Sequence, residues 1–262
     1  MLQNKNIVII GGTAGLGLSA AKAFIANGAN IVVVGRSKDS VAAAKNILGK
    51  NAVAIVGDAI HPETATKAID ICLNEFKNFT GLYHIAGGSG RKMGDGPLHE
   101  LTLDGWNVTL DMNLTSLMLS NQAAIKKFLE LKSGGTVLNM SSVLGYSPSP
   151  KYFSTHGYAA AKSAVFGFTK SVAAFYAKDN IRVNVIAPSL NDTPMAQRAS
   201  GDEEILSFIK TKQPLDGGRI GRPDDLDGLA VYFMSDQSRF TTGQVIAVDG
   251  GWSLSEGQYN HQ

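Results

Sequence analysis

The amino-acid sequence predicts an α/β fold, a doubly wound open parallel sheet of about seven strands with helices on both faces. Short runs rich in valine and isoleucine recur along the chain and are apolar on both faces. Such runs are typical of strands that helices cover on both sides. Longer stretches with helical periodicity separate them. Glycine is in excess, at 29 of 262 residues against 8 prolines, which indicates tight turns and close backbone contacts.

The order of these segments justifies each expected element. The expected strands are Ile7–Ile10, Ile31–Val34, Ala52–Val56, Leu82–Ala86, Thr136–Met140, Ile181–Ala187 and Val245–Val248. The expected helices include Leu16–Asn27, Ser40–Leu48, Pro62–Phe76, Trp106–Leu131, Gly157–Lys178 and Pro223–Met234. No linker-like break interrupts the alternation, so we expect a single domain over residues 1–262. Two irregular stretches, Gly87–Leu98 and Ser147–Gly157, are long enough to predict functional loops.

Composition excludes several classes of protein. Lys and Arg number 24 against 22 Asp and Glu, a net charge of +2, which gives no clustered basic footprint for a nucleic acid. A single cysteine, Cys72, excludes a disulfide scaffold. We find no signal peptide and no membrane-spanning run, so we expect a cytoplasmic protein with no membrane partner. The histidines, His61, His84, His99, His156 and His261, lack metal-ligand spacing, and we expect no metal site.

A glycine-rich turn follows the first strand. Gly11, Gly15 and Gly17 are spaced G-x3-G-x-G, directly before the first expected helix. Glycines let backbone amides approach a pyrophosphate, and a helix N-terminus adds partial positive charge. The turn predicts a dinucleotide site that includes Thr13 and Leu16; the alternative is a glycine turn without a ligand.

The second and third strands bear on the choice of nucleotide. A carboxylate at the end of the second strand would bind the adenosine ribose and repel a 2′-phosphate. Here the strand is followed by Arg36 and Ser37, and an arginine can fork onto a phosphate. We therefore favour NADP(H), with NAD(H) possible if Arg36 is only solvated. Asp58, followed by Ala59, is a candidate for adenine binding or a turn residue ahead of the next helix.

A candidate acid–base pair lies at the start of a later helix. Tyr158 and Lys162 are four residues apart, which places them on one helix face. A nearby ammonium is expected to lower the pKa of the phenol and make it a proton donor or acceptor. Ser142 follows the fifth strand and can bind a substrate oxygen, or serve only the loop. Asn113 can hold a water that links Lys162 to solvent, or be bonded within its helix.

Together these features resemble the short-chain dehydrogenase/reductase family in its single-domain, Rossmann-like form. The resemblance covers about residues 5–254. Its motifs are Gly11-x3-Gly15-x-Gly17, Asp58, Ala86-Gly87, Asn113, Ser142, Tyr158-x3-Lys162, Arg182-Val183-Asn184, Pro188, Thr193, Thr242-Gly243-Gln244 and Val248-Asp249-Gly250-Gly251.

The resemblance implies a role for each motif. Tyr158 is the acid/base, Lys162 lowers its pKa and binds the nicotinamide ribose, Ser142 orients the substrate carbonyl, and Asn113 completes a proton relay. Further cofactor contacts are implied for Ala86, Gly87, Pro188, Ser189, Leu190 and Thr193. Family members commonly form tetramers, so we expect a homotetramer or homodimer built on the long helices after strands four and five and on the closing strand.

The chain departs from the family pattern at four places. Ile10 replaces the usual Thr before Gly11, and His84-Ile85 replaces the usual Asn-Asn. We expect these two changes to remove polar support behind the cofactor pocket. Ser189 replaces the usual Gly, and the stretch from Ser142 to Tyr158 is longer than usual, which is expected to reshape the substrate mouth.

The expected reaction is reversible hydride transfer between a nicotinamide and a ketone or secondary alcohol. The predicted substrate crevice lies between residues 87–98, 142–157 and 190–215. Its predicted pocket residues are Ser142, Leu144, Tyr152, His156, Leu190 and Met195. Mostly apolar walls favour a medium-sized, uncharged carbonyl compound. The alternatives are a 3-oxoacyl-thioester reductase and a non-catalytic dinucleotide-binding regulator.

Overall fold

The computed structural model describes residues 1–257. Its seven strands form one sheet in the order β3-β2-β1-β4-β5-β6-β7, and every neighbouring pair is parallel. This confirms the predicted fold class. The strands are β1 (Asn6–Ile10), β2 (Asn30–Gly35), β3 (Ala52–Val56), β4 (Gly81–His84), β5 (Gly135–Met140), β6 (Ile181–Pro188) and β7 (Val245–Val248).

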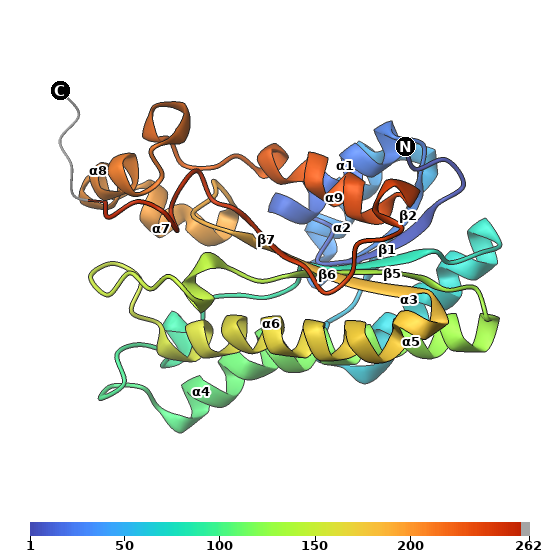
Figure 1. Cartoon of the computed structure of the whole chain (residues 1–262), viewed down its shortest axis with the longest axis horizontal. Helices are drawn as coiled ribbons and strands as arrows, with labels where there is room; N and C mark the ends of the chain where they lie inside the picture. The colour runs from blue at the N-terminus through green and yellow to red at the C-terminus, as the bar shows by residue number, and fades with distance from the viewer. Residues whose placement is uncertain (258–262) are drawn as a thin grey trace.

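Helices cover both faces of the sheet (Figure 1). One face carries α1 (Gly15–Ala26), α2 (Lys38–Leu48) and α9 (Asp227–Met234). The other face carries α3 (Pro62–Phe76), α4 (Leu103–Leu110), α5 (Ser116–Leu131) and α6 (His156–Tyr176). Two short helices, α7 (Gln197–Ser200) and α8 (Glu203–Lys212), lie beyond one end of the sheet.

The central strand β1 explains why the runs are apolar on both faces. Ile7 and Ile9 pack into the apolar cluster with α1, α2 and α9. Val8 and Ile10 pack into the cluster with α3 and α5. Burying each such side chain contributes about 1.5–3 kcal/mol, so alternate residues of one strand hold the two helical layers to the sheet.

Several boundaries differ from the sequence prediction. Strand β4 ends at His84, because the amides of Ile85 and Ala86 both donate to the Ile10 carbonyl and bend the chain out of the sheet. The expected helix over 106–131 is α4 and α5 joined by a wide π-type turn, η3 (Asp111–Thr115). The expected helix over 223–234 begins as a 3-10 turn, η8 (Pro223–Leu226), before α9. Helices α7 and α8 were not predicted.

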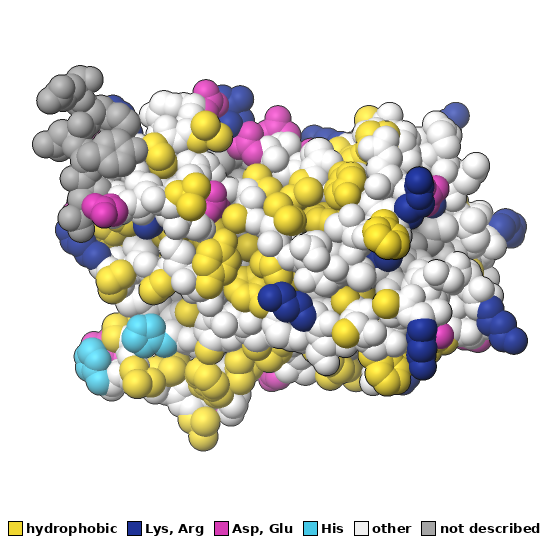
Figure 2. All heavy atoms as spheres, viewed as in Figure 1, with side chains coloured by type: hydrophobic (Ala, Val, Ile, Leu, Met, Phe, Trp, Pro, Cys, Tyr) yellow, Lys and Arg dark blue, Asp and Glu magenta, His cyan; other side chains and the backbone are white. Residues whose placement is uncertain are grey.

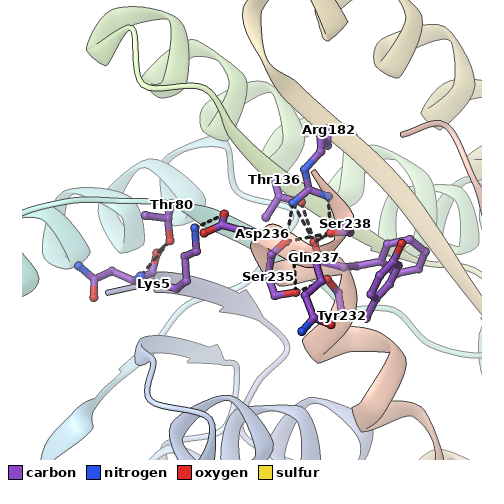
Figure 3. Close-up of polar contacts among 11 residues, drawn as sticks. Lys5, Thr80, Thr136, Arg182, Tyr232, Ser235, Asp236, Gln237 and Ser238 are labelled. Carbon is purple, nitrogen blue, oxygen red and sulfur yellow. Dashed lines mark hydrogen bonds and ion pairs between the residues drawn. The ribbon is translucent and has the colours of Figure 1, made fainter. Parts of the chain in front are cut away.

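The end of α9 is fastened to the sheet by Arg182 of β6 (Figure 3). Its Nη1 donates to Ser238 Oγ at 2.7 Å, and its Nη2 donates to the carbonyls of Phe233 at 3.1 Å and Ser235 at 3.3 Å. Thr136 of β5 donates to the same Phe233 carbonyl at 3.2 Å. The last carbonyls of a helix lack partners within the helix, so these side chains satisfy them and fix α9 against β5 and β6. Burial lowers the pKa of Arg182.

Replacing Arg182 is expected to destabilise this contact. In Arg182→Ala the buried carbonyls lose a charged donor, and the free energy of unfolding should fall by about 2–3 kcal/mol in urea titrations. The control is Lys5→Ala, which breaks the neighbouring ion pair to the exposed Asp236 and should cost less than about 1 kcal/mol. Equal losses in the two variants would show that Arg182 does not fasten α9.

Candidate active site

The carboxyl ends of β1, β4, β5 and β6 meet at one edge of the sheet. Strand order reverses between β1 and β4, and ligands of open α/β sheets bind at such a switch point. The structure brings most of the predicted site residues to this edge. They come from the glycine turn after β1, the loop after β4, the ends of β5 and β6, and the first turns of α6.

The glycine turn is shaped by contacts that leave no room for a side chain. Gly11 has a φ of +91°, and a Cβ there would lie 2.6 Å from the Ala86 amide nitrogen. A Cβ at Gly17 would lie 2.0 Å from the Gly11 carbonyl oxygen. Gly15 has a φ of +50° and lies against Thr193. The turn is therefore packed between the loop after β4 and the segment after β6.

The first turn of α1 suits an anionic group. Its N-cap residue is Ala14, no side chain caps the helix, and its first turn holds no acidic residue. The amides of Gly15, Leu16 and Gly17 have no acceptor among residues 1–257. Free amides and the helix dipole favour phosphate binding, so these residues fit a pyrophosphate.

Of the predicted nucleotide-binding residues near the end of β2, Ser37 and Thr13 make hydrogen bonds within the protein, whereas the side chain of Arg36 makes none with any described residue. Arg36 is exposed, and its guanidinium has no hydrogen-bond or ion-pair partner in the described part of the chain. Ser37 instead caps α2, accepting from Ser40 N at 3.4 Å. Thr13 bonds to Ser40 Oγ at 3.1 Å and covers Gly35, where a Cβ would lie 2.1 Å from Thr13 Oγ1. Arg36 is thus the side chain left available for a ligand.

Asp58 serves the turn before α3. Its Oδ1 accepts from the Ile60 amide at 3.2 Å, and its carbonyl accepts from Thr64 Oγ1 at 2.6 Å. This supports the turn interpretation that the sequence left open. Asp58 and Ala59 are both half-buried, and a contact with adenine stays a prediction.

Lys162 is buried on α6 against the end of β5. Its Nζ donates to the Met140 carbonyl at 3.2 Å and lies 5.6 Å from the centre of the Tyr158 ring. Ser141 Oγ donates to the Lys162 carbonyl at 2.6 Å. Burial lowers the pKa of the Lys162 ammonium to about 8, because an apolar environment disfavours the charged form.

The expected lowering of the pKa of Tyr158 by Lys162 is wrong for this structure. Burial raises the pKa of the phenol to about 12, and the hydrogen bond of Ser142 acts in the opposite direction without cancelling that rise. Ser142 Oγ also accepts from the Leu144 amide at 3.2 Å. Tyr158 is therefore a neutral phenol near pH 7, a form that can donate a proton to an oxygen beside Ser142.

Asn113 lies in the wide turn of the α4–α5 helix and is buried. Its Nδ2 donates to the carbonyls of Gly88 at 2.8 Å and Thr109 at 2.9 Å, and its Oδ1 accepts from the Gly88 amide at 3.1 Å. A Cβ at Gly87 would lie 2.6 Å from Asn113 Oδ1. The side chain thus holds the loop after β4; both of its N–H donors are used by backbone rather than left for a relay water.

The expectation that His84, in place of the usual Asn, removes polar support behind the cofactor pocket is wrong. The ring is fully buried, with Nε2 3.0 Å from the Ala86 carbonyl and Nδ1 2.7 Å from Ser120 Oγ. Burial lowers its pKa to about 3, with a further contribution from Lys162. A neutral ring that donates from Nε2 and accepts at Nδ1 satisfies both contacts. His84 therefore ties the Ala86-Gly87 loop to α5. Ile10, the other substitution, packs in the core.

The segment after β6 is held by residues that the sequence did not single out. Gln213, which is buried, accepts from the Leu190 amide at 3.0 Å and donates to the Leu190 carbonyl at 3.3 Å. The Ser189 carbonyl accepts from Asn191 Nδ2 at 3.0 Å. These bonds and the contact of Thr193 with Gly15 keep residues 188–193 over the glycine turn. Gln213 follows the last residue of α8, a helix that was not predicted from the sequence, so no local pattern marked it.

The predicted substrate pocket is only partly assembled. Leu144, Tyr152 and Leu190 pack into one apolar cluster around the buried Trp252, whose Nε1 donates to the Ser147 carbonyl at 3.2 Å. His156 and Met195 are exposed and stand outside that cluster. Trp252 was missed because it lies far along the chain, near the C-terminus. Its aromatic neighbours are Phe153 and Phe208, each with its ring centre 5.9 Å from that of Trp252.

Two further sequence expectations concern metals and membranes. Within residues 1–257 no group of three or more His, Cys, Asp or Glu side chains could hold a metal ion; His261 lies outside the described residues. None of the helices in the same range is both long and apolar enough to cross a bilayer.

Comparison with known proteins places this site in a family. A family model described as Enoyl-(Acyl carrier protein) reductase matches residues 11–253. The NADP-dependent (R)-specific alcohol dehydrogenase of Lentilactobacillus kefiri is 34% identical over 96% of this chain and 98% of its own. The 3-oxoacyl-(acyl-carrier-protein) reductase of Chlamydia muridarum is 30% identical over 96% of this chain and 98% of its own.

A solved structure gives the same result. A short-chain type dehydrogenase/reductase from Mycobacterium ulcerans superposes with a TM-score of 0.88 at 28% identity, covering 97% of this chain and 91% of that one. With a family model over most of its length and relatives aligned from end to end, the chain belongs to the short-chain dehydrogenase/reductase family.

Proposed function

We propose that the protein is an NADP(H)-preferring oxidoreductase that interconverts a ketone and a secondary alcohol, with Tyr158 as the acid/base. One observation carries this proposal. A half-buried, neutral phenol, a buried lysine and a serine whose side chain lowers the pKa of the phenol lie together at the end of β5 and the start of α6, beside a glycine turn with free amides. Both a proton donor and a nucleotide-binding turn are needed for carbonyl reduction with a nicotinamide.

The chain's own residues account for the proton and the orientation. A bound nicotinamide would supply or accept the hydride. Ser142 donates a hydrogen bond to the substrate oxygen, and Tyr158 gives that oxygen its proton as the carbonyl becomes an alcohol. Lys162 uses one of its three N–H donors on Met140, so the others can bind ribose hydroxyls. In alcohol oxidation the same phenol, once ionised, accepts the proton.

Arg36 supports the preference for NADP(H). It follows β2, where no carboxylate competes, and it is exposed and unpaired within the described range. A guanidinium binds phosphate with two parallel hydrogen bonds. The Lentilactobacillus kefiri relative is named as NADP-dependent, which agrees with this choice.

The substrate is proposed to be a medium-sized, uncharged ketone or alcohol. The walls supplied by Leu144, Tyr152 and Leu190 are apolar and aromatic. A second candidate is reduction of a 3-oxoacyl thioester, favoured by the 30% identity to the Chlamydia muridarum reductase. The basic Lys151 at this mouth is already paired with Glu204, which weighs against binding the phosphate of an acyl carrier.

We also propose that the protein is a homotetramer in the cytoplasm. Figure 2 shows hydrophobic side chains gathered over the middle of the face that carries β7 and α6. Two of the expected contact elements also carry exposed apolar residues: Ile246 on β7, and Phe175 on α6, which is 63% exposed. Large exposed apolar patches mark contact surfaces. The single cysteine, Cys72, is free, and proteins without disulfides are common in a reducing compartment.

Tyr158→Phe tests the proposed acid/base. Removing the phenolic hydroxyl should lower kcat for ketone reduction by about 10²–10⁴-fold, because the phenol is the proposed source of the proton that the substrate oxygen receives. The dissociation constant for NADPH, measured by fluorescence titration, should stay within about twofold. Turnover close to that of the wild-type protein would exclude Tyr158 as the proton donor.

Arg36→Asp tests the nucleotide preference. A carboxylate repels the 2′-phosphate and accepts from ribose hydroxyls, so kcat/KM should fall about tenfold or more with NADPH and rise with NADH. Lys50→Asp, the same charge change at an exposed residue in the turn after α2, is the control. If both variants leave the NADPH-to-NADH ratio unchanged, Arg36 does not bind the nucleotide phosphate.

His84→Ala tests the support that this ring gives to the cofactor loop. The Ala86 carbonyl and Ser120 would lose a buried partner, and NADPH binding should weaken about tenfold. His84→Asn, which restores a short donor and the residue usual in the family, should recover part of the loss. An NADPH affinity in His84→Ala equal to that of wild type would show that the loop is held without His84.

A further inference from the structure

The amino end of α6 lacks the capping groups that a helix normally finds nearby. The first amides of a helix have no partner within it, and a local Ser, Thr, Asp or Asn side chain commonly accepts from them. The N-cap residue here is Thr155, but its side chain makes no capping bond, and the first turn holds no acidic residue. Tyr158 lies in that same first turn.

The missing partners come from the loop after β4. Asp95 Oδ1 accepts from the Gly157 amide at 2.8 Å, and its Oδ2 accepts from the amide of Tyr158 itself at 2.8 Å. The Gly96 carbonyl accepts from the His156 amide at 3.3 Å. Three consecutive amides at the start of α6 are therefore satisfied by residues about 60 positions earlier in the chain.

The contact is buried and closely packed. The exposed fraction of Asp95 is 3%, and a carboxylate in this position is also favoured by the helix dipole. A Cβ at Gly157 would lie 3.1 Å from Asp95 Oδ1, so glycine gives the carboxylate its access to the helix end. Charge-assisted bonds of this length are among the strong hydrogen bonds of proteins.

The same loop is fixed at its other end beside the proposed cofactor site. Asn113 bonds to both the amide and the carbonyl of Gly88, and His84 bonds to the Ala86 carbonyl. The loop thus runs from the glycine turn to the backbone of Tyr158 with hydrogen bonds at both ends. A shift of the loop would move the phenol relative to the cofactor site.

We infer that Asp95 is a positioning residue for the reaction, because it fixes the backbone of Tyr158 through the two amides that its carboxylate accepts. This inference rests on the proposed function. Misplacing a reacting group by about 1 Å can cost on the order of 100-fold in rate. A helix cap with a purely structural role would instead lower stability and leave the rate of the folded protein unchanged.

The experiment compares Asp95→Asn with Asp249→Asn. Asp249 is a matched control, because its two oxygens also accept from two backbone amides, those of Gly251 and Ser253, each at 3.0 Å. In Asp95→Asn, kcat for ketone reduction should fall about tenfold or more, while the dissociation constant for NADPH stays within about twofold. Hydrogen exchange at the Gly157 and Tyr158 amides should accelerate. Asp249→Asn should change kcat by less than about twofold.

Gly157→Ala separates positioning from stability. Alanine favours the helix over glycine, yet its Cβ would press on the carboxylate of Asp95. We expect a melting temperature at least equal to that of wild type together with a kcat reduced severalfold. A kcat in Asp95→Asn equal to that of Asp249→Asn would overturn the inference, as would a fall in kcat matched by an equal loss of NADPH affinity. A wild-type protein that binds NADPH but reduces no ketone would overturn the proposed function first, and this inference with it.

Discussion

The site depends on one buried contact, that between the first turns of α6 and the end of β5. Lys162 donates to the carbonyl of Met140, and Ser141 donates to the carbonyl of Lys162. These bonds cross from helix to strand in opposite directions, so the helix can neither slide nor rotate without breaking one. Ser142, the next residue, acts on Tyr158 by lowering the pKa of its phenol. The chemistry assigned to the site therefore follows from how one helix is seated on the sheet.

The packing of α6 on β5 removes two ionisable groups from water and so changes their pKa values. The buried ammonium of Lys162 and the half-buried phenol of Tyr158 are each shifted toward the neutral form, with the pKa of Lys162 lowered to about 8 and that of Tyr158 raised to about 12. Close to neutral pH the phenol keeps its proton, which is the form that the proposed reduction of a carbonyl requires. Burial, more than the charge of Lys162, decides the protonation of the phenol in this structure.

Local sequence patterns predicted the parts of the fold that depend on one segment at a time. Valine- and isoleucine-rich runs located all seven strands, and the spacing of Tyr158 and Lys162 correctly placed both on α6. Contacts between distant segments could not be read from such patterns. The bend after His84 depends on two amides that share the Ile10 carbonyl, and Asp95 reaches the helix end across 62 residues. Helices α7 and α8 are short and lie within residues 190–215, a stretch that was predicted only to border the substrate crevice.

In this chain the loop after β4 is held by a residue that differs from the one usual in the family. Where the family usually has asparagines, it has His84 and Ile85, and a buried neutral imidazole bonds to the Ala86 carbonyl. Substitution of a motif residue therefore changed the identity of the support without removing it. From the sequence alone, the change from Asn to His predicts a lost hydrogen bond. The structure shows that the imidazole of His84 makes a hydrogen bond to the loop instead.

The most direct test of the account is a crystal structure of the protein with NADP⁺ and a bound ketone or alcohol. The account predicts that the Tyr158 hydroxyl and Ser142 Oγ both lie within hydrogen-bond distance, about 2.6–3.2 Å, of the substrate oxygen, with the pyrophosphate on the free amides of α1. A hydroxyl of Tyr158 far from that oxygen, with another side chain in its place, would contradict it.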